Sequence, residues 1–206
     1  MTAVRLDHLR QYSDALQLRS GQRLALRFVE PGDADALQSY VRGLSQSSRY
    51  RRFLGATSEL PPSLLDGFTH AGEDDRFSVI AIASIDGLER IVAEARYALN
   101  ADQAIIEFGL SVDDRWQGHG IGAALLQNLE CRAAALGATG LFGDTLRSNE
   151  VMISLARKSG FAFRASPGDW RLVRFEKQIA STAQDNPCAS WRMAAESRRI
   201  AQQAGL

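Results

Sequence analysis

The chain has 206 residues, of which 45% are hydrophobic, and its 24 basic and 24 acidic side chains give a formal net charge of zero. This composition excludes wholesale disorder, and the length suits one globular domain with a tail. The neutral total removes the simplest electrostatic case for a nucleic-acid partner or an anionic membrane surface. No apolar run approaches the roughly 18 residues of a membrane helix, and no secretory leader is visible, so we expect a cytoplasmic protein without a membrane partner.

In the first part of the chain the spacing of apolar residues predicts mostly helices. In chain order the predicted elements are an amphipathic helical arm (1–20), a strand (24–29), a helix capped by Asp33 (34–43) and two short helices (47–54 and 62–68). The turn residues Pro31 and Gly32 separate the strand from the first of the globular helices.

The second part begins with strands. Two of them, 77–85 and 91–99, are joined by the hairpin signal Asp86-Gly87-Leu88-Glu89, and a third follows at 104–112. Next come a helix from Ile121 to Gly137, a strand (140–145), a helix (149–159), a strand entered at Gly160-Phe161 and a final β pair with 170–176. Because a meander precedes the alternating elements, we predict a mixed α/β fold and exclude a purely doubly wound parallel sheet.

Histidines and cysteines give little support for a metal site. His8, His70 and His119 lie far apart, and none has a second ligand at HxxxH spacing. The two cysteines, Cys131 and Cys188, make neither a CxxC site nor a disulfide framework. We therefore expect no metal, and we interpret Cys131 as a buried, inert thiol within a helix.

The most informative segment lies between the third meander strand and the following helix. Glycines recur at Gly118, Gly120 and Gly122, where they let the backbone turn sharply and approach a ligand. Backbone N–H groups at a helix N-terminus then bind phosphate or pyrophosphate without a charged side chain. The alternative is a glycine-rich turn that binds no ligand.

A dinucleotide-binding reading of the same glycines is disfavoured. Gly118, Gly120 and Ala123 match G-x-G-x-x-A, but residues 113–117 separate them from the preceding strand. A meander precedes the motif, whereas a dinucleotide motif usually opens its βαβ unit. Asp144, the candidate ribose ligand, lies about 26 residues beyond Gly118, against the usual spacing of roughly 20.

Two segments resemble the GNAT superfamily of acetyl-CoA-dependent N-acetyltransferases. Gln117–Gly122 resembles the (Gln/Arg)-x-x-Gly-x-(Gly/Ala) signature, and Asn149–Phe161 resembles the N-x-x-(A/M)-x-x-L…G-F helix. The resemblance covers about residues 22–178 and implies a central, mostly antiparallel sheet with a splayed parallel strand pair and flanking helices. We therefore expect a helical arm at 1–20, an acetyltransferase domain at 21–178 and a helical tail at 179–206.

A narrower resemblance links the chain to the acetyltransferase domain of bacterial Pat-type protein-lysine acetyltransferases. It rests on Leu44–Phe53 and Asp113–Gln117. In that family the domain is often fused to a further module that this chain lacks. Arg49, Arg51 and Arg52 then have two interpretations that the sequence leaves open, a docking surface for the acceptor or a solvated helix face.

The third meander strand contains the candidate general base. Alternation buries one face and leaves Glu107 on the other with Gly109 and Ser111; the buried face holds Ile106, Phe108, Leu110 and Val112. Glu107 also matches the strand position where many GNAT enzymes carry a base, which would take the proton of the acceptor amine directly or through water. The alternative is a structural carboxylate paired with an arginine such as Arg96.

The remaining site residues are implied by the resemblance. Acetyl-CoA would be the cosubstrate, with its pyrophosphate on the backbone amides of Gln117, Gly118, His119, Gly120, Ile121, Gly122 and Ala123. A backbone N–H near Leu110 or Val112 would stabilise the oxyanion. Asn149 would contact the pantetheine region, cap the following helix, or do both. Ala156 stands where the family often places a tyrosine acid, so no general acid is expected.

The predicted function is transfer of an acetyl group from acetyl-CoA to a primary amine. A protein lysine is the first expected acceptor and a small-molecule amine the second. A non-catalytic acyl-CoA sensor would keep the glycine loop without needing the chemistry of Glu107. We expect a monomer or homodimer and no nucleic-acid partner.

Overall fold

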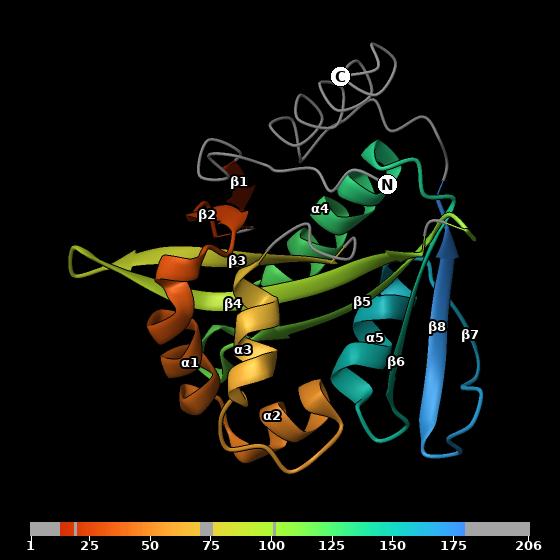
Figure 1. Cartoon of the computed structure of the whole chain (residues 1–206). Coiled ribbons are helices and arrows are strands. Elements are labelled where there is room, and N and C mark those ends of the chain that lie inside the picture. The colour runs from red at the N-terminus through yellow and green to blue at the C-terminus, as the bar shows by residue number, and fades with distance from the viewer. Residues whose placement is uncertain (1–12, 19, 71–75, 101, 180–206) are drawn as a thin grey trace, which may run out of the picture.

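The computed structural model describes residues 13–18, 20–70, 76–100 and 102–179 (Figure 1). These residues form one eight-stranded sheet with the order β1-β2-β3-β4-β5-β6-β8-β7. The strands are β1 (Asp14–Gln17), β2 (Arg23–Phe28), β3 (Arg76–Ile85), β4 (Leu88–Asn100), β5 (Ile105–Val112), β6 (Gly140–Leu146), β7 (Ala162–Ala165) and β8 (Leu172–Gln178). Only β5 and β6 pair in parallel within this sheet, which confirms the predicted mixed fold with one parallel strand pair.

The helices match the predicted order closely. They are α1 (Ala34–Gly43), α2 (Gln46–Phe53), α3 (Pro62–Thr69), α4 (Ile121–Ala135) and α5 (Glu150–Lys158), with short 3-10 turns η2 (Pro31–Asp33) and η4 (Asp114–Trp116). Alternate residues of β3 separate two cores, with Val79 and Ala81 in the larger and Ile80 and Ile82 in the smaller. Residues of α4 and α5 pack into the larger core, whereas residues of α1 and α3 pack into the smaller one.

The start of the chain differs from the prediction. Residues 14–17 form β1, which pairs antiparallel with β2, instead of the end of a helical arm over 1–20. The spacing of leucines near 3.6 favoured a helix, but Leu16 is a buried residue of a strand that extends the sheet. The rest of that arm up to residue 12, and the predicted tail beyond Ile179, lie outside the described residues.

Two further expectations need correction. The hairpin turn is Asp86-Gly87 alone, because β4 begins at Leu88, and the φ angles of 52° and 77° suit a tight two-residue turn. Cys131 is buried in α4 as expected, but it is disulfide-bonded and not a free thiol.

A buried charge joins the first strands to α4. The side chain of Arg132 is 0% exposed, and its Nη2 donates a hydrogen bond of 2.9 Å to Asp14 Oδ2 in β1. Its Nε donates to Asn128 Oδ1, and the guanidinium lies 4.8 Å from the ring centroid of Phe28 in β2. Since an interior charge must be paired and hydrogen-bonded, Arg132 fixes how α4 packs against β1 and β2.

We predict that Arg132→Met destabilises the protein by about 3–5 kcal/mol, because the buried Asp14 carboxylate then loses its cation. Urea unfolding measures this loss. The matched control is Arg164→Met, since Arg164 pairs with Glu176 where the two side chains are 49% and 43% exposed. That change should cost less than about 1 kcal/mol. Equal losses in the two variants would contradict the structural role of Arg132.

Candidate functional site

The sheet opens between β5 and β6. The two strands pair only from Ile105 to Glu107, opposite 140–142, and then separate, as Figure 1 shows. Asp113 N donates to Val92 O in the strand pair β4–β5. Because the direction of backbone groups alternates along an antiparallel ladder, those of Leu110 and Val112 point away from β4 and into the opening. The structure therefore places both predicted oxyanion donors at the separation.

Gly143 lies where β6 leaves β5. A Cβ atom at this position would lie 2.9 Å from the carbonyl oxygen of Phe108 and 2.6 Å from the ring of Phe175. No side chain fits between these groups without a shift of the backbone or the ring. The close approach of the two strands just before they separate thus requires glycine.

The turn after β5 presents backbone amides at the start of α4. Gly118 and Gly120 have φ angles of 80° and 88°, in the left-handed region that favours glycine. A Cβ at either residue would meet nothing within 4 Å, so the loop borders open space. Ala124 N makes the first α4 bond, to Gly120 O, and the preceding amides of Ile121 and Ala123 have no intrahelical acceptor. The partial positive charge of a 15-residue helix suits an anion here.

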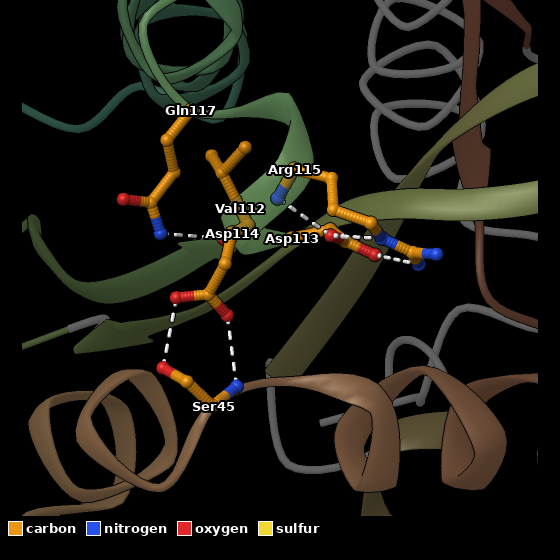
Figure 2. Close-up of polar contacts among 6 residues, drawn as sticks. All are labelled: Ser45, Val112, Asp113, Asp114, Arg115 and Gln117. Carbon is orange, nitrogen blue, oxygen red and sulfur yellow. Dashed lines mark hydrogen bonds and ion pairs between the residues drawn. The ribbon is translucent and has the colours of Figure 1, made fainter.

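Side chains of the same loop mostly serve its structure. Gln117 Nε2 donates to Val112 O at 3.1 Å (Figure 2), and the ring of His119 is exposed, with Nδ1 2.9 Å from Gln117 O. Ile121 is buried in the larger core, and a Cβ at Gly122 would lie 3.0 Å from Leu155 Cδ2. These residues can therefore contribute to a ligand site chiefly through their backbones.

An aspartate anchors this turn to α2. The carboxylate of Asp114 accepts hydrogen bonds from the backbone N–H and the hydroxyl of Ser45, both at 2.8 Å (Figure 2). It also accepts one from the Ser48 hydroxyl at 2.7 Å. Burial raises the pKa of Asp114, but these donors outweigh burial and hold the pKa below its usual range. The neighbouring Asp113 accepts three bonds from Arg115, which lower its pKa as well.

Asn149 caps α5 at the end of β6. Its Oδ1 accepts from Met152 N at 3.3 Å, and its Nδ2 donates to Thr145 Oγ1 at 2.9 Å. The capping role is therefore present, and a contact of Asn149 with a cosubstrate stays a prediction. Ala156 is fully buried in α5 and offers no polar group to the opening.

Glu107 is exposed on β5 and available to a ligand. No hydrogen bond or ion pair joins its carboxylate to another described residue, and Gly109 and Ser111 share its face of the strand. The alternative pairing with Arg96 is not formed, because Arg96 donates to Gly67 O and lies over the ring of Phe68.

A buried network on this same face of the sheet was not predicted. Glu94 is 1% exposed and accepts hydrogen bonds of 2.6 Å from both Arg52 Nε and the Ser111 hydroxyl. Ser111 is in turn 3.0 Å from Tyr40 Oη, whose pKa is raised well above its usual range, first by burial and then by Glu94. The only sequence signal was an acidic residue among the alanines and valine of a strand.

The structure gives two of the three α2 arginines hydrogen-bond partners within the protein. Arg52 is paired with Glu94, and Arg49 donates to the carbonyl oxygens of Thr57, Arg42 and Leu44, which closes the loops on either side of α2. Of the three arginines only Arg51 is exposed, whereas Arg49 and Arg52 are half-buried. Arg49 and Arg52 therefore help to hold α2 and its loops in place, and a contact of this segment with an acceptor stays a prediction.

A hollow of about 660 Å³ lies between α1, the β3–β4 hairpin and η4, but neither Glu107 nor the glycine turn lines it. Among the described residues, no group of three or more His, Cys, Asp or Glu side chains could hold a metal ion. None of the described helices is long and apolar enough to cross a membrane.

The sequence profile described as the Acetyltransferase (GNAT) family matches residues 45–161, more than half of the chain. The chain belongs to the GNAT acetyltransferase family. An acetyltransferase of Pseudomonas aeruginosa is 27% identical over 152 residues, which cover 74% of this chain and 82% of that protein. Acetyltransferase Pat of Mycolicibacterium smegmatis is 27% identical over 146 residues, covering 70% of this chain but only 43% of Pat.

Solved structures agree with this family. The GNAT domain of S. lividans PAT superimposes with a TM-score of 0.73 at 25% identity, covering 82% of this chain and 97% of that domain. A phosphinothricin acetyltransferase (Pat) from Sinorhizobium meliloti in complex with AcCoA has a TM-score of 0.60 at 19% identity, over 81% of this chain and 94% of that one. At this low identity, the similarity to the S. meliloti structure shows only a common fold. The chain is thus a GNAT acetyltransferase with the predicted architecture.

The stability that Asp114 contributes by anchoring the glycine turn should depend on pH. Because the folded-state pKa of Asp114 is depressed, its stabilising contribution is present above the unfolded-state value of about 3.9 and is lost as the pH falls below it. We predict that Asp114→Asn lowers the free energy of unfolding at pH 7 and that its difference from the unsubstituted protein shrinks at pH 3. Urea unfolding at both pH values measures this.

The control for this measurement is Asp86→Asn in the hairpin turn, where the carboxylate bonds to no other described residue and asparagine tolerates the positive φ. The difference in unfolding free energy between Asp86→Asn and the unsubstituted protein should be similar at the two pH values. If Asp114→Asn loses as much unfolding free energy at pH 3 as at pH 7, or more, the carboxylate charge does not anchor the turn.

Proposed function

We propose that this acetyltransferase takes acetyl-CoA as the acetyl donor and a protein lysine as the acceptor. The observation that supports this most is that three features occur on β5 or directly after it: the β5–β6 separation, the left-handed glycine turn and the exposed carboxylate of Glu107. The opening offers backbone donors to a thioester, the turn offers amides to a pyrophosphate, and the carboxylate offers a proton acceptor.

The fit to the donor rests on the backbone of the glycine turn. In this proposal the pyrophosphate lies against the N–H groups of residues 117–123, where Gly118 and Gly120 leave open space and α4 contributes its positive end. The pantetheine arm follows the separation between β5 and β6. Asn149 acts there mainly by fixing the start of α5, since its amide is engaged in the cap.

The acceptor amine must first lose a proton. A lysine ammonium with a pKa near 10.4 is neutral only about once in 2,500 at pH 7, which corresponds to about 4.6 kcal/mol. Glu107, directly or through a water molecule, takes this proton. A carboxylate without an ion-pair partner keeps its lone pairs free for that role.

The neutral amine then attacks the thioester carbon. The new N–C bond forms, the C–S bond breaks, and the developing oxyanion accepts a hydrogen bond from the N–H of Leu110 or Val112. The attacking nitrogen, positively charged once its bond to carbon has formed, releases its second proton to water. The coenzyme leaves as a thiolate, whose pKa near 8.5 makes it a good leaving group, and it takes up a proton from water because Ala156 supplies none. The products are an amide and the free thiol of CoA.

The choice of protein lysine follows from the Pat-type segments. Leu44–Phe53 and Asp113–Gln117 are distant in the sequence, but the bonds of Asp114 to Ser45 and Ser48 join them beside the site. The chain spans less than half the length of the M. smegmatis Pat that it matches, so the lysine acceptor is proposed for this chain's own site and not taken from that whole protein.

We predict that Gly120→Ala weakens acetyl-CoA binding about tenfold or more, because alanine in the left-handed region costs about 1–2 kcal/mol and displaces the amides. Isothermal titration calorimetry measures the affinity. The matched control is Gly87→Ala, since Gly87 has a φ of 77° and equally open surroundings but lies in the distant hairpin. Gly87→Ala should bind acetyl-CoA normally. Normal binding by Gly120→Ala would remove the turn from the donor site.

Glu107→Gln should lower kcat about 100-fold or more, because the amide cannot take the proton of the amine. Acetyl-CoA affinity should be unchanged, since Glu107 lies outside the glycine turn. CoA release from acetyl-CoA with Nα-acetyl-lysine methylamide as acceptor measures the rate. Unchanged turnover would exclude Glu107 as the base, and acetyl-CoA binding without turnover even in the unsubstituted protein would favour a sensor.

A further inference from the structure

One N–H donor of Arg52, on Nη1, makes no hydrogen bond within the buried network. Arg52 gives its Nε and Nη2 to Glu94, at 2.6 Å and 3.1 Å, but no described residue accepts a hydrogen bond from its Nη1. The Arg52 side chain is still 13% exposed, so the guanidinium is not sealed in the core. A half-buried N–H group of this kind needs an oxygen partner, from water or from a ligand.

The free donor lies over the strand that bears the proposed base. A Cβ at Gly109 would lie 2.7 Å from Arg52 Nη1, so the missing side chain is what lets the guanidinium lie there. Gly109 is two residues from Glu107 and on the same face of β5, which corresponds to about 7 Å along the strand. A molecule whose nitrogen reaches Glu107 therefore passes close to Arg52.

The local charge also favours an oxygen-bearing molecule. Arg96 lies opposite Gly109 on β4, and its pKa is lowered by burial and by the nearby charges of Arg76 and Arg52. Glu94 is the buried acid between these guanidinium groups and balances only one positive charge. The guanidinium groups of Arg52 and Arg96 near Gly109 thus outnumber the one buried acid beside them, which favours a carbonyl or carboxylate oxygen at this point. The Glu107 carboxylate farther along the same face attracts the ammonium group of the acceptor.

Arg52 is held in place before any ligand arrives. Two bonds to Glu94 fix the plane of its guanidinium, which also lies 5.3 Å from the ring centroid of Phe53 and 5.9 Å from that of Phe68. A donor that is already oriented loses little conformational entropy on binding, and arginine loses less per hydrogen bond than lysine.

We propose that Arg52 Nη1 donates a hydrogen bond to a carbonyl or carboxylate oxygen of the acceptor and so selects amines that carry such an oxygen. For a protein lysine this oxygen belongs to the peptide group beside the side chain. The inference rests on the proposed function and adds a residue that determines which amines are used. Arg52 is a specificity-determining residue, and Glu94 positions it.

The test compares two amines of similar length, Nα-acetyl-lysine methylamide and n-pentylamine, which has no oxygen. Arg52→Lys keeps a cation for Glu94 but lacks Nη1. We define the selectivity as kcat/KM for the lysine derivative divided by kcat/KM for pentylamine. Arg52→Lys should lower this ratio about tenfold to a hundredfold, which is the usual effect of losing a hydrogen bond from a charged donor. The change should appear in KM for the lysine derivative, with KM for acetyl-CoA unchanged.

Gly109→Ala is the second variant, because the methyl group moves the Arg52 guanidinium away from Gly109 without removing its charge. It should change the ratio in the same direction. The matched control is Gly67→Ala. A Cβ there would lie 3.1 Å from Nη2 of Arg96 and so disturbs the neighbouring arginine, not Arg52. Gly67→Ala should keep the ratio of the unsubstituted protein.

Three results would overturn the inference. An unchanged ratio in Arg52→Lys and Gly109→Ala, with normal lysine acetylation, refutes the role of Arg52 and leaves the proposed function intact. An equal loss for both amines shows that Arg52 acts on the fold or on the thioester and not on the acceptor oxygen. If the unsubstituted protein acetylates neither amine, the proposed function fails and the inference fails with it.

Discussion

The separation of β5 from β6 is the constraint on which the rest of the site depends. Parallel strands that stop pairing leave backbone N–H and C=O groups that need other partners. Here the part of β5 beyond Glu107 no longer pairs with β6 and faces the opening. The carbonyl oxygen of Val112 accepts a hydrogen bond from Gln117 instead, and the glycine turn into α4 follows directly. Gly143 permits the strands to come close immediately before they part, because a side chain there would meet the carbonyl oxygen of Phe108 and the ring of Phe175.

Two buried ion pairs hold the walls of this opening in place. Arg132 and Asp14 fasten α4 to the first strand, and Arg52 and Glu94 fasten α2 to the middle of the sheet. A buried pair contributes little net stability compared with apolar packing, but it tolerates few alternative arrangements, because each charge must keep its partner. The glycine turn is held between these regions, with Asp114 joining it to α2.

Much of this architecture was predictable from local pattern. The period-two strands, the Asp-Gly hairpin and the apolar stripe that begins at Ile121 each determine their own element, and the motifs at Gln117–Gly122 and Asn149–Phe161 indicated the family that the comparison confirms. Strand β1 was missed because four residues among helix-spaced leucines become a strand only when β2 lies alongside, a contact that no local period expresses.

The sequence by itself determined the order of elements, the family and the exposed face of β5 with Glu107, since these depend on periodicity and on short contiguous motifs. Only the tertiary structure decided what the charged residues do. The sequence does not distinguish Arg49, Arg51 and Arg52, yet in the structure only Arg51 is exposed, and Arg52 is paired with Glu94, 42 residues away. The physical reason is that the partner of a buried charge is set by how distant elements pack, and sequence spacing carries no record of that packing.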